Sequence, residues 1–434
     1  MLKTIFQILF SHHPLSFVLC PPAFLLFPHL ANWDCQQLYQ LSPSRYPRLL
    51  LQCLSLYLFR ISDFGFRIFP GKHGGVLTDL SLRHFRCFET LACEFAPGMN
   101  VFVGANAQGK TSLLEAVCVL ARLQSPRTSR LGEAVRHGRR GFVVDGHVEG
   151  RHMQFYYAPE RKKLALDSVT QTGTADYLEV ARVVWFGNAD IDLVRGGAEL
   201  RRRFMDFAGT QMMAGYRQTL RAYERALRSR NHLLKAPRLN WREVAAFDGP
   251  LIEHGTALDQ ARARLLRELE PHAAAGQRAM SGAAEELRLN YAGGSGGDLR
   301  AALDEGRERD ARLRQTGSGP HRDDIELLLD GRGSQFASEG QQRSMAVALK
   351  LGQARLLEER AGRPPLLLLD DVFGELDLER RNALLEHLPV RAQQLITTTH
   401  LEWLKEIAPG RVHRVDHGRV SLMDEAGGAG WRAT

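Results

Sequence analysis

The sequence contains few cysteines, the residues that stabilise many domains through disulfides or metal sites. Its six cysteines form no C-x-x-C pair and share no repeated spacing; they are Cys20, Cys35, Cys53, Cys87, Cys93 and Cys118. This pattern predicts neither a zinc site nor a disulfide framework, and it favours a reducing, cytoplasmic location. No apolar run reaches the roughly 20 residues that cross a bilayer, so we expect no membrane partner.

The sequence also lacks a strong excess of either charge. Lys and Arg number 57 and Asp and Glu 49, which gives a net charge of +8 over 434 residues. A mild basic surplus suits a partner rich in phosphate but does not by itself identify one. The length is sufficient for two or three structural units, each with its own core.

Residues 1–75 show no helical or strand periodicity and are rich in proline. Their apolar start has features of a secretory signal, but His12, His13 and Pro14 interrupt it and no A-x-A cleavage site follows. We expect this segment to be a doubtful N-terminal extension, either disordered or untranslated. Translation is then expected to begin near Val76, because valine codons include an alternative bacterial start.

From residue 76 onward the pattern is that of an α/β protein. Strand patterns at residues 77–88 and 99–103 lead into a glycine-rich turn and a helix pattern at residues 110–123. A nucleotide site requires this order of strand, glycine loop and helix. Three further runs predict an antiparallel sheet; they are residues 142–148, 152–157 and 163–167.

Residues 200–305 read as long, charge-rich helices that split the α/β part in two. The helical patterns cover residues 217–234, 241–269 and 274–289, with expected breaks at Pro237, Pro250 and Pro271. A solvated helical lobe is the first interpretation, and a DNA-contacting arm is the alternative. Alternating strands and helices return afterwards, at residues 324–329, 341–359, 365–370, 378–388 and 394–398.

The glycine-rich turn matches the P-loop pattern G-x-x-x-x-G-K-[ST]. Its backbone N–H groups and the following helix N-terminus suit phosphate. The alternative without a binding function is a glycine turn that only connects two elements. Lys110 is expected to reach the β- and γ-phosphates and Thr111 to bind Mg²⁺. The predicted nucleotide-binding residues here are Gly104, Ala105, Asn106, Ala107, Gln108, Gly109, Lys110, Thr111 and Ser112.

A run of four leucines ends in two carboxylates, Asp370 and Asp371, in the manner of a Walker B strand. Alone it would indicate a core strand with a polar end, but together with the P-loop it predicts a catalytic site. Asp370 is expected to bind Mg²⁺ and Asp371 to orient or deprotonate the attacking water. Asp371 and Lys110 are therefore the candidate catalytic residues.

A further helix start lies just upstream of this strand, at Ser338, Gly340 and Gln341. Serine is a natural N-cap and the glycine permits a close backbone approach, so the segment suits an anion as well as plain capping. In ABC-type ATPases the signature motif occupies this position, and we expect these three residues to bind nucleotide. Residues 374–377 correspond to a D-loop, and His400 is expected to contact the γ-phosphate, with a surface histidine as the alternative.

The order of these motifs resembles the ABC-type ATPase head shared by SMC proteins and the RecF family. Several short sequence segments resemble the RecF family in particular; they are residues 80–86, 125–130, 193–196, 201–206, 230–235 and 319–324. The implied fold is α/β, an ABC-type P-loop ATPase head with an inserted α-helical lobe. Residues 76–199 and 306–434 would form the head and residues 200–305 the lobe.

The resemblance implies a head-to-tail homodimer with ATP and Mg²⁺ held between the P-loop of one subunit and Ser338 and Gly340 of the other. It further implies slow ATP hydrolysis, binding of double-stranded and single-stranded DNA at gaps, and recombinase loading with RecR and RecO type partners. The chain departs from the family at residues 187–190, where a proline and a glutamate are expected before Asp190. That departure puts the local turn in doubt.

Other interpretations remain open at this point. The ATPase subunit of an ABC transporter would share the nucleotide motifs, an ATP-dependent nuclease would need a further acidic metal domain, and an SMC-like clamp would need long heptad runs. DNA contact is also open, because the lobe's arginines suit phosphates but equally suit a solvated helix face. The arginines in question are Arg201, Arg202, Arg203, Arg225, Arg228 and Arg230.

Overall fold

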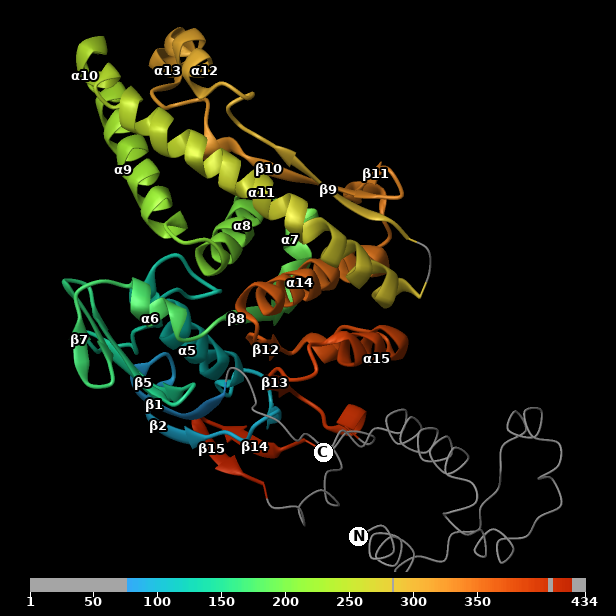
Figure 1. Cartoon of the computed structure of the whole chain (residues 1–434). Helices are drawn as coiled ribbons and strands as arrows, with labels where there is room; N and C mark the ends of the chain where they lie inside the picture. The colour runs from blue at the N-terminus through green and yellow to red at the C-terminus, as the bar shows by residue number, and fades with distance from the viewer. Residues whose placement is uncertain (1–75, 283–284, 405–408, 424–434) are drawn as a thin grey trace, which may run out of the picture. The chain divides into compact units, whose positions relative to one another are not determined.

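The computed structural model describes residues 76–282, 285–404 and 409–423 (Figure 1). The predictions for residues 1–75 lie outside this part of the chain. None of the helices described combines the length and the apolar composition needed to cross a membrane.

An antiparallel sheet forms the first layer of the head, in the order β2-β1-β4-β5-β6-β7. Its strands are β1 Leu77–Phe85, β2 Phe88–Glu94, β4 Phe142–Val148, β5 Arg151–Ala158, β6 Arg161–Leu166 and β7 Val169–Gln171. The expected antiparallel sheet is confirmed. The single strand expected over residues 77–88 is wrong at its end, because Arg86 has a left-handed backbone with φ of 51° and the chain turns back there.

A second, mostly parallel sheet has the order β15-β14-β3-β13-β12-β8. Its strands are β3 Met99–Val103, β8 Val183–Gly187, β12 Leu366–Asp370, β13 Gln394–Thr398, β14 Arg411–Asp416 and β15 Arg419–Leu422. The leucines of β12 are buried on both faces of this sheet. Leu366 and Leu368 join the core with the first sheet, whereas Leu367 and Leu369 join the core on the opposite face.

Helices cover both faces of the parallel sheet. The helix α5 Lys110–Arg122 is buried between the two sheets, which explains why most of its residues are inaccessible to solvent. On the other face lie α14 Glu339–Ala361 and α15 Leu378–His387. Two short helices complete this region, α6 Ala175–Glu179 and α7 Asp192–Arg195.

The helical lobe extends from the head in Figure 1 and contains a small sheet of its own. Its helices are α8 Ala198–Met212, α9 Tyr216–Leu234, α10 Trp241–Ala245, α11 Asp248–Ser281, α12 Leu299–Glu305 and α13 Arg307–Leu313. The sheet has the order β11-β10-β9, with β9 Leu287–Ala292, β10 Asp324–Leu329 and β11 Arg332–Gly333. Strands from both sides of residue 305 therefore pair with one another.

The expected breaks at Pro250 and Pro271 are wrong, because α11 runs through both positions. Pro250 lies in the first turn, where a backbone N–H has no helical acceptor. Pro271 lies within the helix, where the flanking Leu269 and Ala273 are buried in a core shared with α14. Packing therefore overrides the local preference of proline to end a helix.

The helix expected over residues 274–289 is also wrong. α11 ends at Ser281, followed by Gly282 with a left-handed φ of 61°. The chain then forms β9, which pairs antiparallel with β10. The expected break at Pro237 is confirmed, because the chain leaves the helix after Leu234 and helix α10 begins at Trp241.

Candidate nucleotide-binding site

The P-loop joins β3 to α5 and contains two positions that require glycine. A Cβ at Gly104 would lie 2.2 Å from the carbonyl oxygen of Val415. A Cβ at Gly109 would lie 2.8 Å from the Cys87 sulfur, and Gly109 also has a φ of 111°. The two glycines of the pattern are thus explained by close packing at both positions and by the left-handed backbone at Gly109.

Lys110 extends across this loop. Its Nζ donates hydrogen bonds of 2.7 Å to the Gly104 carbonyl and 2.8 Å to the Ala105 carbonyl. An ammonium group has three protons, so one remains for a further acceptor. Burial lowers the pKa of Lys110, while the carboxylates of Asp371 and Asp370 oppose that effect. A positive charge is thereby held where the triphosphate of a bound nucleotide would lie.

Thr111 and Asp370 converge from α5 and β12. The Thr111 hydroxyl donates to Asp370 Oδ1 at 2.8 Å, and the Thr397 hydroxyl donates to the same oxygen at 2.8 Å. Burial raises the pKa of Asp370, and these two hydrogen bonds lower it. Hydroxyl and carboxylate oxygens are ligands that Mg²⁺ accepts, so this pair fits the cation.

The rest of a cation's coordination shell has to come from other ligands. No group of three or more His, Cys, Asp or Glu side chains in the described part of the chain is placed to hold a metal. Mg²⁺ commonly keeps several waters and binds through one or two protein groups plus nucleotide phosphates. The Thr111 and Asp370 pair is compatible with that mode of binding.

Asp371 follows β12 with a left-handed backbone, φ 54°. Its N–H donates to the Thr397 hydroxyl at 3.0 Å, which holds the turn. Burial raises the pKa of Asp371, whereas the positive charge of Lys110 lowers it. Within the described ranges its carboxylate accepts no hydrogen bond, so its oxygens are available to a water molecule.

His400 lies near Asp371, on an exposed turn after β13. The turn is closed by the Thr398 hydroxyl, which donates to the His400 carbonyl at 2.9 Å. The structure thus brings together Lys110, Asp371 and His400, which are far apart in the sequence. The candidate base Asp371, the cation Lys110 and the candidate γ-phosphate contact His400 therefore lie around one P-loop.

The signature segment begins α14 with a reciprocal cap. The Ser338 hydroxyl accepts from the Gln341 N–H at 3.2 Å, and the Gln341 side chain accepts from the Ser338 N–H at 2.8 Å. The Gln341 side chain also donates to Glu285 at 3.0 Å. Among the described residues, no hydrogen bond joins this segment to the P-loop of the same chain. Within one described chain the signature segment and the P-loop are therefore not linked by hydrogen bonds.

Sequence reasoning missed Arg380, which connects the D-loop region to the signature helix. Its Nε donates to the Ser344 hydroxyl at 2.9 Å, and its guanidinium also pairs with Asp377. A Cβ at Gly340 would lie 3.0 Å from Arg380 Nη2, so the glycine leaves room for the guanidinium. An arginine three residues after an N-cap aspartate is a common pattern and gave no signal in the sequence.

The unusual segment at residues 187–190 keeps its turn without the expected proline and glutamate. Asp190 Oδ2 accepts from the Gly187 N–H at 2.8 Å, and Asp190 Oδ1 pairs with Lys350 Nζ at 2.9 Å. Burial raises the pKa of Asp190, and Lys350 opposes that effect. The doubt about this turn is resolved, because the aspartate alone closes it and ties it to α14.

Comparisons with known proteins agree with this arrangement. Residues 76–419 match the family model described as RecF/RecN/SMC N terminal domain. The DNA replication and repair protein RecF of Synechococcus sp. (strain JA-2-3B'a(2-13)) is 39% identical over 356 residues, which cover 76% of this chain and 94% of the relative. The chain belongs to the RecF family.

Other relatives of this RecF-family chain support the assignment. The DNA replication and repair protein RecF of Symbiobacterium thermophilum is 38% identical over 369 residues, which cover 80% of this chain and 98% of that protein. Among solved structures, the recombination mediator protein RecF of the RecFOR pathway in its RecF-ATP form has a TM-score of 0.74 at 28% identity. That match covers 82% of this chain and 99% of the solved chain, and it supports the ABC-type head fold. Membership of this family disfavours the transporter alternative.

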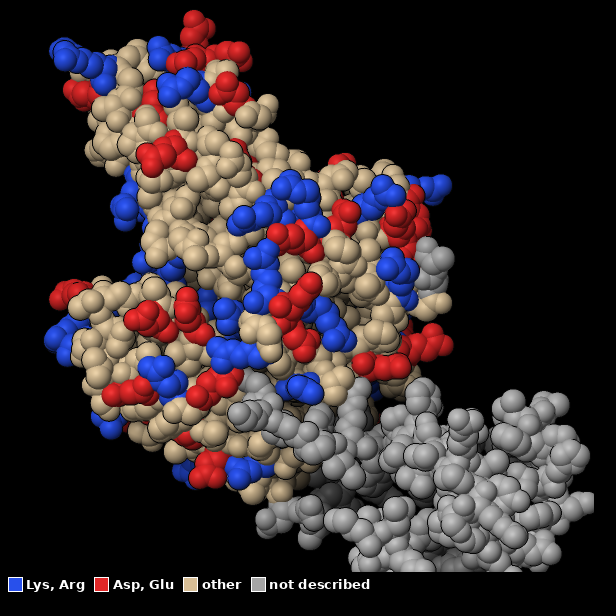
Figure 2. All heavy atoms as spheres, in the orientation of Figure 1, with Lys and Arg blue, Asp and Glu red and all other residues tan. Residues whose placement is uncertain are grey.

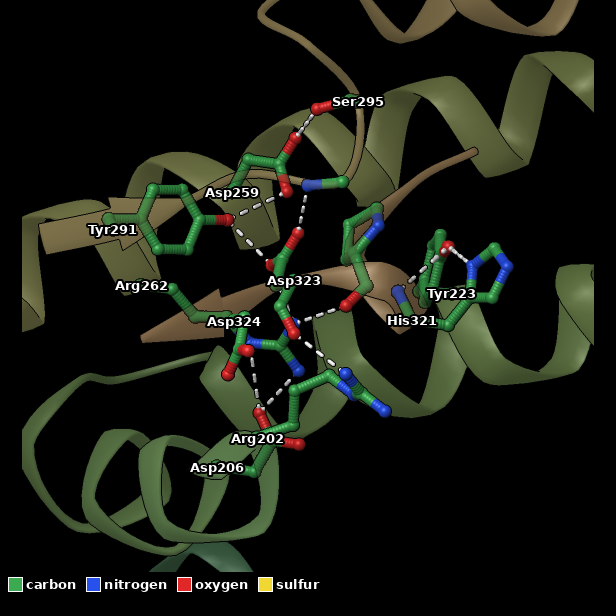
Figure 3. A network of polar contacts seen from close by, with 12 residues as sticks. Arg202, Asp206, Tyr223, Asp259, Arg262, Tyr291, Ser295, His321, Asp323 and Asp324 are labelled. Atoms are coloured by element: carbon green, nitrogen blue, oxygen red, sulfur yellow. Dashed lines mark hydrogen bonds and ion pairs between the residues drawn. The ribbon is translucent and has the colours of Figure 1, made fainter. Parts of the chain in front are cut away.

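One RecF-like segment, residues 319–324, forms a buried network of polar contacts, the hub, between the helices of the lobe and the small sheet of the lobe (Figure 3). Asp323 is 0% exposed and accepts from Arg262 Nη1 at 2.7 Å, from the Tyr291 hydroxyl at 2.6 Å and from the Gly294 N–H at 2.8 Å. His321 contacts the Tyr223 hydroxyl at 2.6 Å. The segment therefore has a structural role, which its sequence alone did not reveal.

Three of the six arginines considered for DNA contact in this RecF-family chain instead bind other residues of the fold. Arg201 makes a two-pronged ion pair with Asp324 at 2.6 and 2.9 Å. Arg202 donates to the Asp323 carbonyl at 2.7 Å. Arg230 is 1% exposed and pairs with Asp310 at 2.7 Å and with a second aspartate of the lobe. The other three lie on the surface; they are Arg203, Arg225 and Arg228.

Proposed function

We propose that this chain is an ATP-dependent DNA-binding protein of recombinational repair and replication that binds DNA as a homodimer with ATP between its subunits. The observation that carries the proposal is the separation of two half-sites. The P-loop with Lys110 lies in one part of the head, whereas the Ser338 end of α14 offers a second helix N-terminus suited to an anion and, among the described residues, shares no hydrogen bond with that P-loop. A second copy, placed head to tail, supplies each half-site with its complement.

In this proposal the chain's own groups divide the work of nucleotide binding. Loop N–H groups and Lys110 hold the phosphates, Thr111 and Asp370 hold Mg²⁺, and Asp371 orients the attacking water. Ser338, Gly340 and Gln341 of the second copy approach the γ-phosphate, beside His400 of the first. The bound Mg²⁺ would supply charge neutralisation of the phosphate oxygens. Hydrolysis is slow, because a single chain lacks half of these groups.

An exposed aromatic side chain beside the signature segment supports a shared interface. Phe336 is 77% exposed and lies two residues before Ser338. Single exposed apolar residues are common, but this one adjoins a segment already assigned to subunit contact. Closure of the dimer would bury it and add to the stability of the ATP-bound state.

The proposal also assigns binding partners to the chain and separate roles to its head and its lobe. In this proposal residues 76–199 and 306–434 act as the head and residues 200–305 as the lobe, with α13, β10 and β11 of the C-terminal part packed into the lobe. RecF relatives carry the description DNA replication and repair protein, and the solved RecF chains belong to the RecFOR pathway. We therefore assign this chain gap-containing DNA, RecR and RecO type partners, recombinase loading and a cytoplasmic site of action.

A pair of substitutions at Ser338 tests the sandwich. Aspartate and asparagine both cap helices well, so α14 is retained in each variant. Ser338→Asp places a negative charge against the partner's γ-phosphate, whereas Ser338→Asn does not. We expect the aspartate variant to bind ATP as a monomer and the asparagine variant to dimerise with ATP. ATP-dependent dimers of Ser338→Asp, measured by light scattering, would exclude the head-to-tail arrangement.

A further inference from the structure

The exposed face of α9 carries a continuous basic stripe. The helix core side is formed by Tyr216, Tyr223, Arg230 and Leu234, which are buried. The opposite side has basic residues at spacings of three and four, which place them on one face. These residues are Arg217, Arg221, Arg225, Arg228, His232 and Lys235, and together they form the α9 stripe.

A solvated helix face would normally alternate its charges, and the α9 stripe does not. Glu224 is the one acidic residue of the helix, and it pairs with Arg228 at 3.7 Å. Arg221 and Arg225 have no ion-pair partner in residues 76–282, 285–404 and 409–423. The stripe spans about 27 Å at 1.5 Å per residue, and Glu224 compensates only part of its positive charge.

The N-terminal end of the stripe runs into a buried cluster of arginines. Arg122, at the end of α5, is 2% exposed and donates only to backbone carbonyls, of Leu178, Ala181 and Thr210. Its Nε and the Nε of Arg217 have no hydrogen-bond partner. Burial first, and then the positive charge of Arg217, lowers the pKa of Arg122 to about 9. Burial first, and then Arg221, lowers the pKa of Arg217 to about 10.

Buried like charges without a counter-ion are unfavourable, so the positive field of this cluster favours an anion at the adjoining surface. It lies where α8 and α9 of the lobe meet the head, because Arg122 bonds to both the α6 region and the end of α8. Figure 2 shows the surface hollowed between these parts of the lobe and the head, with basic side chains in the hollow. A polyanion could therefore enter the hollow and continue along α9.

We infer that the α9 stripe forms a track for the phosphate backbone of duplex DNA, and that the buried Arg122–Arg217 cluster adds positive potential at its N-terminal end. The inference rests on the proposed DNA-binding function and assigns it to a surface. A duplex carries a charge on each strand every 3.4 Å or so along its axis, so a 27 Å row of basic side chains faces about eight base pairs. Contacts of this kind position DNA without selecting a sequence.

The experiment compares two triple variants of the full chain. Arg221→Gln/Arg225→Gln/Arg228→Gln removes charge from the stripe, and Arg300→Gln/Arg312→Gln/Arg314→Gln removes the same charge from exposed positions elsewhere in the lobe. Duplex affinity is titrated against salt. For the stripe variant we expect the slope of log K against log salt to fall by about 2.7 and the affinity by roughly tenfold or more. The control variant should keep the parent slope to within about one unit.

A second variant separates a DNA-contacting role from a merely structural one. Arg217→Gln relieves repulsion with Arg122 and Arg221, so it should raise the melting temperature of the DNA-free protein while weakening duplex binding. A lower melting temperature with unchanged DNA affinity would overturn the inference. Equal slopes for the two triple variants would overturn it too, as would selective loss of binding to polyglutamate instead of duplex. If the parent dimerises with ATP but these variants bind DNA normally, the α9 track fails and the sandwich stands.

Discussion

Thr111 and Asp370 are 259 residues apart in the sequence, yet the Thr111 hydroxyl donates a 2.8 Å hydrogen bond to Asp370 Oδ1. This contact joins the start of α5 to the end of β12 and places two oxygen ligands side by side. The intervening lobe does not separate them, because β3, β13 and β12 are neighbours in one parallel sheet. The two parts of the head thereby meet at one candidate nucleotide site.

Substitution of Asp370 tests the role of this contact in Mg²⁺ binding. In Asp370→Asn the amide retains the shape but loses the charge that holds the cation. We expect ATP affinity to become insensitive to Mg²⁺, measured by calorimetry with and without the cation. Thr397→Val, which removes the other hydroxyl on the same oxygen, is the control and should keep the Mg²⁺ dependence. A full Mg²⁺ effect in Asp370→Asn would rule out this ligand.

The hub in Figure 3 predicts a large stability effect at Asp323. Asp323→Asn leaves the buried Arg262 with one carboxylate fewer and keeps only one of the two oxygens that accept from Tyr291 and from Gly294. Breaking a buried ion pair costs about 3–5 kcal/mol, so we expect the free energy of unfolding in urea to fall by that order. The neighbouring Asp324→Asn should cost about 1 kcal/mol, because its pair with Arg201 is partly exposed. Equal costs would contradict a special role for the hub.

Asp259 predicts a dependence of stability on pH. Burial raises its pKa from 3.8 to about 6, and the charge of Asp323 adds to the effect. The folded protein keeps this proton to a higher pH than the unfolded chain does, so the stabilisation is complete below about pH 4 and is lost as pH rises through about 6. Asp259→Asn has no such proton to lose. We expect the melting temperature of the parent, relative to this variant, to fall between pH 4 and 6.5; a constant difference would contradict the assignment.

Pro271 predicts a gain of stability on substitution. It lies on the exposed side of α11, where it removes one backbone hydrogen bond from the helix interior. Pro271→Ala should restore that bond and stabilise the protein by about 1–3 kcal/mol, measured by thermal or urea unfolding. Pro250→Ala, in the first turn of the same helix, should have little effect because no bond is missing there. Destabilisation by Pro271→Ala would show that the proline shapes a bend on which packing depends.

The sequence predicted the head better than the lobe, for a physical reason. The head strands at residues 99–103 and 394–398 were predicted with both boundaries, because short apolar runs between turn residues leave little alternative. The helix and strand boundaries around residues 271–292 were not predictable, because burial against α14 and pairing with β10 decide them. Local propensity carries no information on such partners.

The same contrast holds for the site. The P-loop and Walker B residues are recognisable because their chemistry fixes both residue type and spacing. The role of Arg230 could not be predicted, because its partner Asp310 is 80 residues away and buries it. An arginine on a helical pattern has the same appearance in the sequence whether it faces water, DNA or a buried aspartate.

The proposed function depends on two copies of the chain that share one nucleotide, and the Asp371→Asn variant tests this most directly. The variant retains every phosphate ligand but lacks the carboxylate that activates water, so ATP should remain bound between subunits. Sedimentation with ATP should show accumulated dimers for Asp371→Asn, monomers for Lys110→Ala, and monomers for both without nucleotide. An Asp371→Asn protein that binds ATP yet stays monomeric would contradict the account.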